Sequence, residues 1–337
     1  MDAQIRQILD WSGNPERALH DFNSFLRLYS EKMGRSFDLE TVNAKRLLSI
    51  FGNSFFLSEW LMKNPEEADR TVESPCIETD KKLKDYDLEL EEAFKALPIQ
   101  TLDSVSSLLR HYKYQEYLRL TLKDLSQAAG IESILSEISD LATCLVQKSL
   151  LYLLKEMQSD WGKPENMLDD NSLETCDFQV IAMGKWAGRE LNYSSDIDFQ
   201  LVYSSDQTRI IGPKQISAHE YYVKLTEKLT RLLSEKTEFG FVYRVDLNLR
   251  PEGKSGTLAN SLSAIEHYYE AFGQEWERQA LIKAIPIAGD ARLAKEFQSL
   301  ISPFVWRKTM SLETIHQMKE MKRKVHESIS KGYPRGI

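Results

Sequence analysis

The hydrophobic pattern of the chain changes near residue 160, from a spacing of three and four to strict alternation. Before that point, apolar residues recur as they do along one face of an amphipathic helix. The first such stripe consists of Leu19, Phe22, Phe25, Leu26 and Tyr29. Similar stripes occupy residues 47–61, 108–125 and 131–154. We therefore expect a helical domain over residues 1–160.

Two stretches of the second half alternate in the manner of strands. In the first, an apolar residue stands at every odd position from 197 to 203, and aspartate stands at positions 196 and 198. In the second, residues 240–250, apolar side chains again take the odd positions. Because successive side chains of a strand point to opposite faces, we expect Asp196 and Asp198 on one polar face and Asp246 on another.

The remaining segments complete the expected fold. An apolar run at residues 178–183 ends at Gly184 and Lys185, which predicts a strand, a turn and a short helix before the strand at 196–203. Polar residues and chain breakers at 161–177 are typical of a linker, and helical spacing resumes after residue 260. The fold class is therefore α+β and predominantly helical. Its expected parts are a helical domain (1–160), a central mixed sheet (161–260) and a C-terminal helical segment (261–337).

Composition excludes several classes of function. The 337 residues carry a formal net charge of −8, whereas nucleic-acid grooves are usually basic. No apolar run approaches the roughly 20 residues that a membrane helix needs, and Met1–Gln4 do not begin a signal peptide. Cys76, Cys144 and Cys176 form no cluster, as is usual in a reducing compartment. We expect a cytoplasmic protein that binds neither nucleic acid nor membrane.

The three aspartates of the alternating stretches are the candidate catalytic and metal-binding residues. Neighbouring carboxylates repel one another, and a structure keeps them together when a cation lies between them. Oxygen ligands of this kind suit a hard ion such as Mg²⁺. Asp196, Asp198 and Asp246 could hold two such ions about 3.5 to 4 Å apart, the arrangement that serves phosphoryl and nucleotidyl transfer. A single D-x-D pair on a strand is common by chance, so the third aspartate carries much of this interpretation.

Glycine and cationic residues near these aspartates are the candidate phosphate-binding groups. A glycine turn lets backbone N–H groups approach a phosphate closely. The candidates are Gly184, Lys185, Arg189, Arg250 and Lys254. Arg244 has a simpler interpretation, as the ion-pair partner of a neighbouring carboxylate. The run Gly253-Lys254-Ser255 resembles the end of a phosphate loop, but Asn248 stands where that motif requires glycine.

Two long blocks of the sequence resemble a known enzyme family. They read GKWAGRELNYSSDIDFQLVY and RVDLNLRPEGKSGTLANSLSAIEHYYEAFGQEWERQALIKAIPIAGD. Both are similar to signature blocks of the glutamine synthetase adenylyltransferase and adenylyl-removing enzymes, which belong to the DNA polymerase β-like nucleotidyltransferase superfamily. Helical segments such as LLSIFGNSFFLSEWLMKNPEE agree. The resemblance implies a polymerase β-like central sheet and Asp196, Asp198 and Asp246 as Mg²⁺ ligands, with Ser194 and Ser195 beside the metal site.

The resemblance also implies the reaction. Enzymes of this family have two similar halves: one attaches AMP from ATP to a tyrosine of glutamine synthetase, and the other removes it by phosphorolysis to give ADP. The segment GFVYRVD and the run Trp276-Glu277-Arg278 look more like the amino-terminal, adenylyl-removing half. Because the sequence stops at Ile337, we expect a truncated piece of that half.

Three functions remain as hypotheses at this point. The leading one is Mg²⁺-dependent removal of AMP from adenylylated glutamine synthetase. The second is the forward transfer of AMP from ATP, because both directions need the same metals. The third is a catalytically idle module that docks glutamine synthetase or a PII nitrogen-signalling protein. The three retained aspartates speak against the third.

Overall fold

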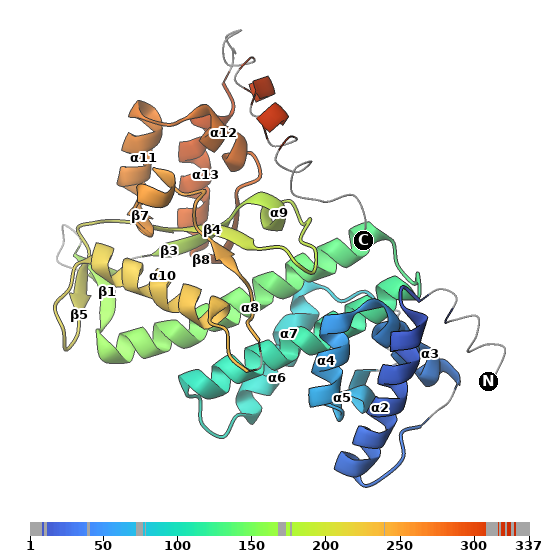
Figure 1. Cartoon of the computed structure of the whole chain (residues 1–337). Helices are drawn as coiled ribbons and strands as arrows, with labels where there is room; N and C mark the ends of the chain where they lie inside the picture. The colour runs from blue at the N-terminus through green and yellow to red at the C-terminus, as the bar shows by residue number, and fades with distance from the viewer. Residues whose placement is uncertain are drawn as a thin grey trace. The chain divides into compact units, whose positions relative to one another are not determined.

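The structure of the chain is a computed structural model (Figure 1). It describes residues 12–38, 41–71, 79–167, 173–175, 177–238 and 240–307, with a few single residues and short runs elsewhere. Contacts divide the chain into two compact units. The helical unit comprises Met1–Leu141 and Lys236–Val242, and the sheet unit comprises Ala142–Glu235 and Tyr243–Ile337. This division differs from the three parts expected above, whose boundaries stay a prediction.

The helical unit forms the helices that its apolar spacing predicts. They are α2 (Pro15–Met33), α3 (Thr41–Asn53), α4 (Phe55–Lys63), α5 (Glu67–Thr71), α6 (Leu83–Ala96), α7 (Leu102–Leu125) and the first part of α8 (Ile131–Asp160). Helix α2 begins where the side chain of Asn14 accepts a hydrogen bond from the backbone of Arg17, and it ends at Gly34 with φ 67°. Its apolar face is aromatic, with the rings of Phe25 and Phe51 5.6 Å apart.

Charged side chains are buried in the helical unit as well. Glu137 of α8 is 2% exposed. Its Oε1 accepts a hydrogen bond from Lys123 Nζ at 2.6 Å, and its Oε2 accepts one from Arg119 Nη2 at 2.7 Å. Arg119 Nε donates in turn to Glu116 at 2.7 Å. We call Glu116, Arg119, Lys123 and Glu137 the buried ion network. Each of its carboxylates faces a cation, so burial leaves no unpaired charge.

The sheet unit contains a mixed sheet and a small antiparallel one. Their strands are β1 (Lys163–Met167), β2 (Leu173–Thr175), β3 (Phe178–Ala182), β4 (Ile197–Tyr203), β5 (Arg209–Ile211), β6 (Val245–Asp246), β7 (Ala259–Ser261) and β8 (Ile285–Gly289). The mixed sheet has the order β6-β4-β3-β8, with β7 also paired to β4, and the small sheet has the order β2-β1-β5. Strand β4 is antiparallel to β3 but parallel to β6 and β7. The expected α+β, predominantly helical fold is therefore confirmed.

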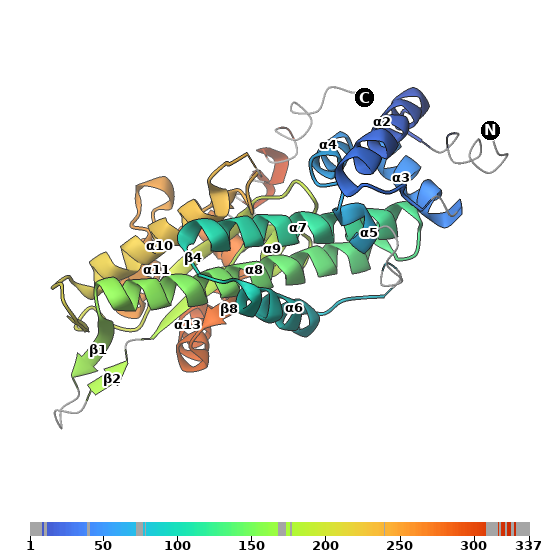
Figure 2. The same cartoon turned by 90° about the horizontal axis from the view of Figure 1, so that it is seen from below.

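Some segments of the sheet unit differ from the expectation. The predicted linker at 161–177 includes β1 and β2, an antiparallel hairpin that lies near the end of α8 in Figure 2. Strand β5 lies in the polar stretch after β4 and pairs with β1. Conversely, the alternating stretch 240–250 contributes only the short strand β6. Short edge strands carry a weak sequence signal because their stability comes from the partner strand.

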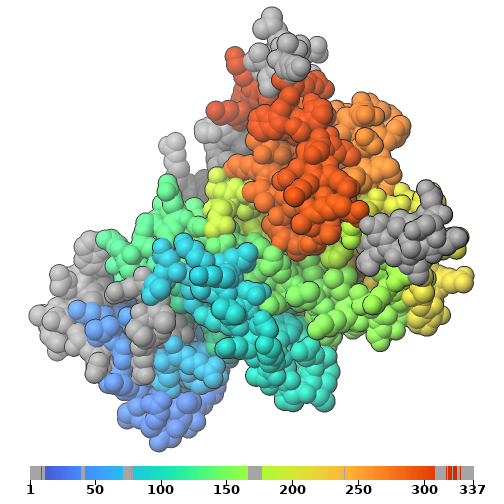
Figure 3. Space-filling model, turned by 180° about the vertical axis from the view of Figure 1, so that it is seen from behind, coloured from blue at the N-terminus to red at the C-terminus, as the bar shows by residue number. Residues whose placement is uncertain are grey.

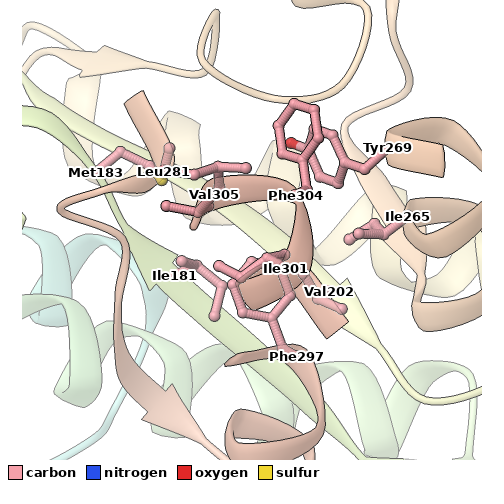
Figure 4. Close-up of a cluster of buried hydrophobic side chains, with 10 residues drawn as sticks. All are labelled: Ile181, Met183, Val202, Ile265, Tyr269, Leu281, Phe297, Ile301, Phe304 and Val305. Carbon is pink, nitrogen blue, oxygen red and sulfur yellow. The ribbon is translucent and has the colours of Figure 1, made fainter. Parts of the chain in front are cut away.

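Helices pack on the mixed sheet, and the hydrophobic core lies between the helices and the strands. They are α9 (Gly184–Ala187), α10 (Ala218–Ser234), α11 (Leu262–Ala271), α12 (Glu275–Leu281) and α13 (Ala291–Val305). Figure 4 shows Ile181 of β3 and Val202 of β4 on either side of Ile301 and Phe297 of α13, all members of one buried cluster. The opposite side of α13 is polar and lies on the surface seen in Figure 3. Among the described helices, none is long and apolar enough to cross a membrane.

Candidate active site

Gly184 joins β3 to α9 and lies against Asp198. Its φ is 57°, a backbone conformation that favours glycine. A Cβ atom placed on Gly184 would lie 2.6 Å from Asp198 Oδ2. The backbone N–H of Met183 donates to the carbonyl of Asp198 at 2.9 Å, which keeps the turn and the strand together. The glycine therefore provides room for a carboxylate. The short helix that follows leaves Lys185 exposed and electrostatically coupled to Asp198.

Asp198 and Asp246 lie side by side on parallel strands. The register of β4 and β6 pairs Ile197 with Val245 and Asp198 with Asp246. Burial, together with the charges of Asp246 and Asp196, raises the pKa of Asp198 to about 6, and the charge of Lys185 opposes this shift. Asp246 Oδ1 accepts a hydrogen bond from the backbone N–H of Asn248 at 2.7 Å. Two like charges thus meet at the sheet edge, which is the electrostatic condition that a bound cation relieves.

Asp196 lies just before β4 rather than within it. Its carboxylate is 46% exposed, and its Oδ1 accepts a hydrogen bond from Arg244 Nε at 2.5 Å. Arg244 is thus the ion-pair partner that the sequence suggested. Within the described residues, no three acidic, histidine or cysteine side chains form a group arranged to hold a metal ion. The oxygen donors and the raised pKa of Asp198 still fit a hard cation, provided that Asp196 exchanges its partner.

Ser194 and Ser195 belong to the turn that precedes Asp196. The side chain of Asn192 accepts hydrogen bonds from the backbone N–H of Ser194 and from the hydroxyl of Ser195, both at 3.0 Å. The backbone N–H of Asn192 donates to Ser195 Oγ at 3.1 Å. The carbonyl of Ser194 accepts a hydrogen bond from Arg244 Nη2. Both serines therefore shape the turn beside the aspartates.

Arg250 lies close to Asp246 but directs its donors to backbone carbonyls. Its side chain donates to Leu247 at 2.7 Å, to Lys254 at 3.2 Å and to Gly256 at 2.8 and 3.0 Å. Burial lowers its pKa, and the charge of Asp246 opposes that shift. Arg250 therefore stabilises the turn at 247–256, and its role as a phosphate-binding residue stays a prediction. Lys254, in a 3-10 turn at Gly253–Ser255, is exposed.

Arg189 follows α9 and is exposed, with a left-handed backbone at φ 56°. Its backbone N–H donates to the carbonyl of Trp186 at 3.0 Å, which closes the end of the short helix. Left-handed backbone is uncommon outside glycine and is a form of strain that structures retain near functional sites. Arg189 therefore stays a candidate phosphate contact by its position next to the glycine turn.

Sequence reasoning named Glu277, a buried glutamate of α12, only within the run Trp276-Glu277-Arg278 and not as a site residue. It is 1% exposed, and its carboxylate accepts hydrogen bonds from Tyr268 Oη at 2.9 Å and from the backbone N–H of Gln274 at 2.7 Å. Burial raises its pKa, and hydrogen bonds from Gln274, Tyr268 and the backbone of Glu252 oppose the shift. Glu277 thus links α11 and α12 to the turn after Asp246. The Q-x-x-E spacing of a capping box was its available sequence signal.

Comparisons with known proteins show the family of the chain. A family model described as glutamate-ammonia ligase adenylyltransferase matches residues 44–300, which include Asp196, Asp198 and Asp246. Similar curated proteins carry the name bifunctional glutamine synthetase adenylyltransferase/adenylyl-removing enzyme. One from Shewanella oneidensis is 30% identical over 292 residues, which cover 87% of this chain and 30% of that protein. One from Xanthobacter autotrophicus is 38% identical over 223 residues, 66% of this chain and 22% of that protein.

A third relative, from Mannheimia haemolytica, is 32% identical over 275 residues, 81% of this chain and 27% of that protein. This chain therefore spans less than a third of the length of the curated relatives that it matches.

Proposed function

Because the chain belongs to the glutamate-ammonia ligase adenylyltransferase family, we propose that it is a Mg²⁺-dependent nucleotidyltransferase that removes AMP from adenylylated glutamine synthetase by phosphorolysis. The observation that carries this proposal is the pairing of Asp198 with Asp246 across β4 and β6, where burial and like charge raise the pKa of Asp198 to about 6. A carboxylate kept at such a cost is typical of a functional site.

The reaction exchanges one phosphorus–oxygen bond for another. An oxygen of inorganic phosphate bonds to the phosphorus of the adenylyl group, while the bond from that phosphorus to the tyrosine oxygen breaks. ADP leaves, and the tyrosine oxygen recovers a proton. Asp198, Asp246 and Asp196 would hold Mg²⁺, which neutralises negative charge on the phosphates when it is bound. The exposed ammonium groups of Lys185 and Lys254 would bind and orient the phosphates.

Two features support the proposed direction and partners. The relatives' name covers both attachment and removal of AMP, and the blocks GFVYRVD and Trp276-Glu277-Arg278 favour removal. Adenylylated glutamine synthetase is thus the proposed substrate. Phosphate, ADP and ATP are the proposed small ligands, and a PII nitrogen-signalling protein in the same cytoplasm is a proposed regulator.

ADP formation tests the proposal directly. The chain is incubated with adenylylated glutamine synthetase and phosphate, with either Mg²⁺ or a chelator, and ADP is measured. We expect ADP to form in the sample with Mg²⁺ and not in the sample with the chelator. The rate of ADP formation should be about 10² to 10³ lower for Asp198→Asn, the range for losing one charge-stabilising group. Glu190→Gln is the matched control because Glu190 is an exposed carboxylate paired with Lys283. Equal ADP formation by wild type and Asp198→Asn would refute the proposal.

The reverse activity is separated by labelled ATP. If the chain attaches AMP, label from ATP appears on unmodified glutamine synthetase without added phosphate. Under the proposed direction, label does not appear, and adenylylated glutamine synthetase loses its AMP only when phosphate is present.

A further inference from the structure

The side chain of Arg244 binds the metal-site candidate Asp196 and the residue two positions before it. Its Nε donates to Asp196 Oδ1 at 2.5 Å, and its Nη2 donates to the carbonyl of Ser194. The backbone carbonyl of Arg244 also accepts a hydrogen bond from the N–H of Ile197 at 3.0 Å. The guanidinium is therefore fixed one residue before β6, on the strand edge that carries Asp246.

The turn beside Asp196 has its own internal support. Asn192 accepts hydrogen bonds from Ser194 and Ser195, and its backbone donates back to Ser195. The hydrogen bond from the N–H of Ile197 to the carbonyl of Arg244 joins backbone to backbone, so it does not depend on the arginine side chain. Other hydrogen bonds thus hold this turn without the guanidinium. The main contribution of the guanidinium is its positive charge next to Asp196.

Exposure makes the ion pair of Arg244 and Asp196 easy to exchange. The two side chains are 53% and 46% exposed, and exposed ion pairs contribute little to stability because water and salt screen them. The carboxylates of Asp198 and Asp246 stand side by side on the neighbouring strands. A divalent ion placed at these two carboxylates would attract the third one more strongly than a single exposed guanidinium does.

We propose that Arg244 and a divalent cation compete for Asp196, and that the released guanidinium then binds a phosphate group of the substrate. This inference rests on the proposed function for the identity of the phosphate-bearing substrate. A guanidinium donates in a planar fork that matches two phosphate oxygens. Arg244 is then a substrate-positioning residue that reaches phosphate only after the cation has bound, which orders the two binding events.

Calorimetric titration with Mg²⁺ alone tests the competition. We expect Arg244→Gln to bind Mg²⁺ about three- to fivefold more tightly than wild type, since an exposed ion pair is then no longer broken. Lys185→Gln is the matched control because Lys185 is also an exposed cation of the site, coupled to Asp198 but without an ion pair to Asp196. If Mg²⁺ affinity rises as much in Lys185→Gln as in Arg244→Gln, the loss of any nearby positive charge explains the increase, and the proposal is overturned.

Titration with ADP at saturating Mg²⁺ tests the second step. The loss of a charged hydrogen-bond donor to phosphate should weaken ADP binding by Arg244→Gln about tenfold. Arg244→Lys keeps the charge but lacks the fork, so its ADP affinity should fall between those of wild type and Arg244→Gln. Unchanged ADP affinity in Arg244→Gln, or weaker Mg²⁺ binding by this variant, contradicts the inference.

These readouts are independent of turnover. If wild type forms no ADP from adenylylated glutamine synthetase, the proposed function fails while the order of Mg²⁺ affinities still decides the competition. If turnover is normal but Arg244→Gln and wild type bind Mg²⁺ equally, the competition fails while the proposed function stands.

Discussion

Carboxylates of the buried ion network in the helical unit are paired with cations, whereas Asp198 in the sheet unit lies beside another carboxylate. In the network, both oxygens of Glu137 accept hydrogen bonds from cations, at 2.6 and 2.7 Å. At the sheet edge, Asp198 instead lies beside Asp246, and its pKa is raised by burial and by like charge. Paired charges are compatible with a purely structural role, whereas a carboxylate held against another carboxylate needs a different explanation.

The exposed charged residues next to each group of carboxylates differ in the same way. Asp80 is exposed but bound to Lys123 and Ser133, and these hydrogen bonds hold its pKa below the ordinary value. Around Asp198, the opposing charge is the exposed ammonium of Lys185. The carboxylates of the network are thus neutralised by lysine and arginine of the same chain. The charge of Asp198 and Asp246 can be neutralised further by a bound cation. This contrast is a physical reason to look for ligands in the sheet unit.

The largest expected effect comes from breaking the network. Glu137→Gln removes the carboxylate that Arg119 and Lys123 share and leaves them only Glu116 and Asp80, an excess of buried positive charge that costs about 3–5 kcal/mol in the free energy of unfolding. Urea unfolding of the full chain, followed by circular dichroism, measures this loss. Glu91→Gln is the control because Glu91 forms an exposed ion pair with Lys95, and no measurable change is expected. Equal midpoints for Glu137→Gln and Glu91→Gln would mean that the network does not stabilise the fold.

A smaller loss is expected at the glycine turn of the site. Gly184→Ala adds a Cβ atom 2.6 Å from Asp198 Oδ2 on a backbone with φ 57°, and such strain costs about 1–3 kcal/mol. The same clash displaces Asp198, so ADP formation should fall more than stability does. Gly130→Ala is the matched control, because a Cβ at Gly130 meets nothing within 4 Å. If Gly184→Ala unfolds and turns over like Gly130→Ala, the turn does not position Asp198.

The sequence was most informative where a residue's role depends on local pattern. Alternation located β4 around Asp198 and the D-x-D pair, and helical spacing located most of the helical unit. It could not foresee that Asp196 lies before the strand, because that depends on the turn that Asn192 closes. Nor could it foresee the burial of Arg250, whose donors are used by carbonyls of its own turn. These features arise from tertiary packing, which spacing does not encode.

The smallest expected effect is the change in the free energy of unfolding with pH that the ionisation of Asp198 causes. Its folded-state pKa of about 6 lies above the ordinary value of 3.8, so as the pH falls the folded chain binds this proton before the unfolded chain does. The ionised carboxylate therefore destabilises the fold above about pH 6. That cost disappears as the pH falls from about 6 towards about 4, where the folded chain holds the proton and the unfolded chain does not yet.

Asp198→Asn removes the ionisation and should reveal this cost. With a chelator present, we expect the variant to be more stable than wild type by roughly 1 kcal/mol at pH 8, a value reduced for solvent screening, and the gain should shrink towards zero near pH 4. Urea unfolding at several pH values measures it. Glu190→Gln is the control, because it removes an exposed carboxylate that Lys283 already pairs and that does not contribute to the shift at Asp198, so it should give no such gain. A gain for Asp198→Asn that is independent of pH would mean that Asp198 is not held against like charge, and the contrast with the buried ion network would then disappear.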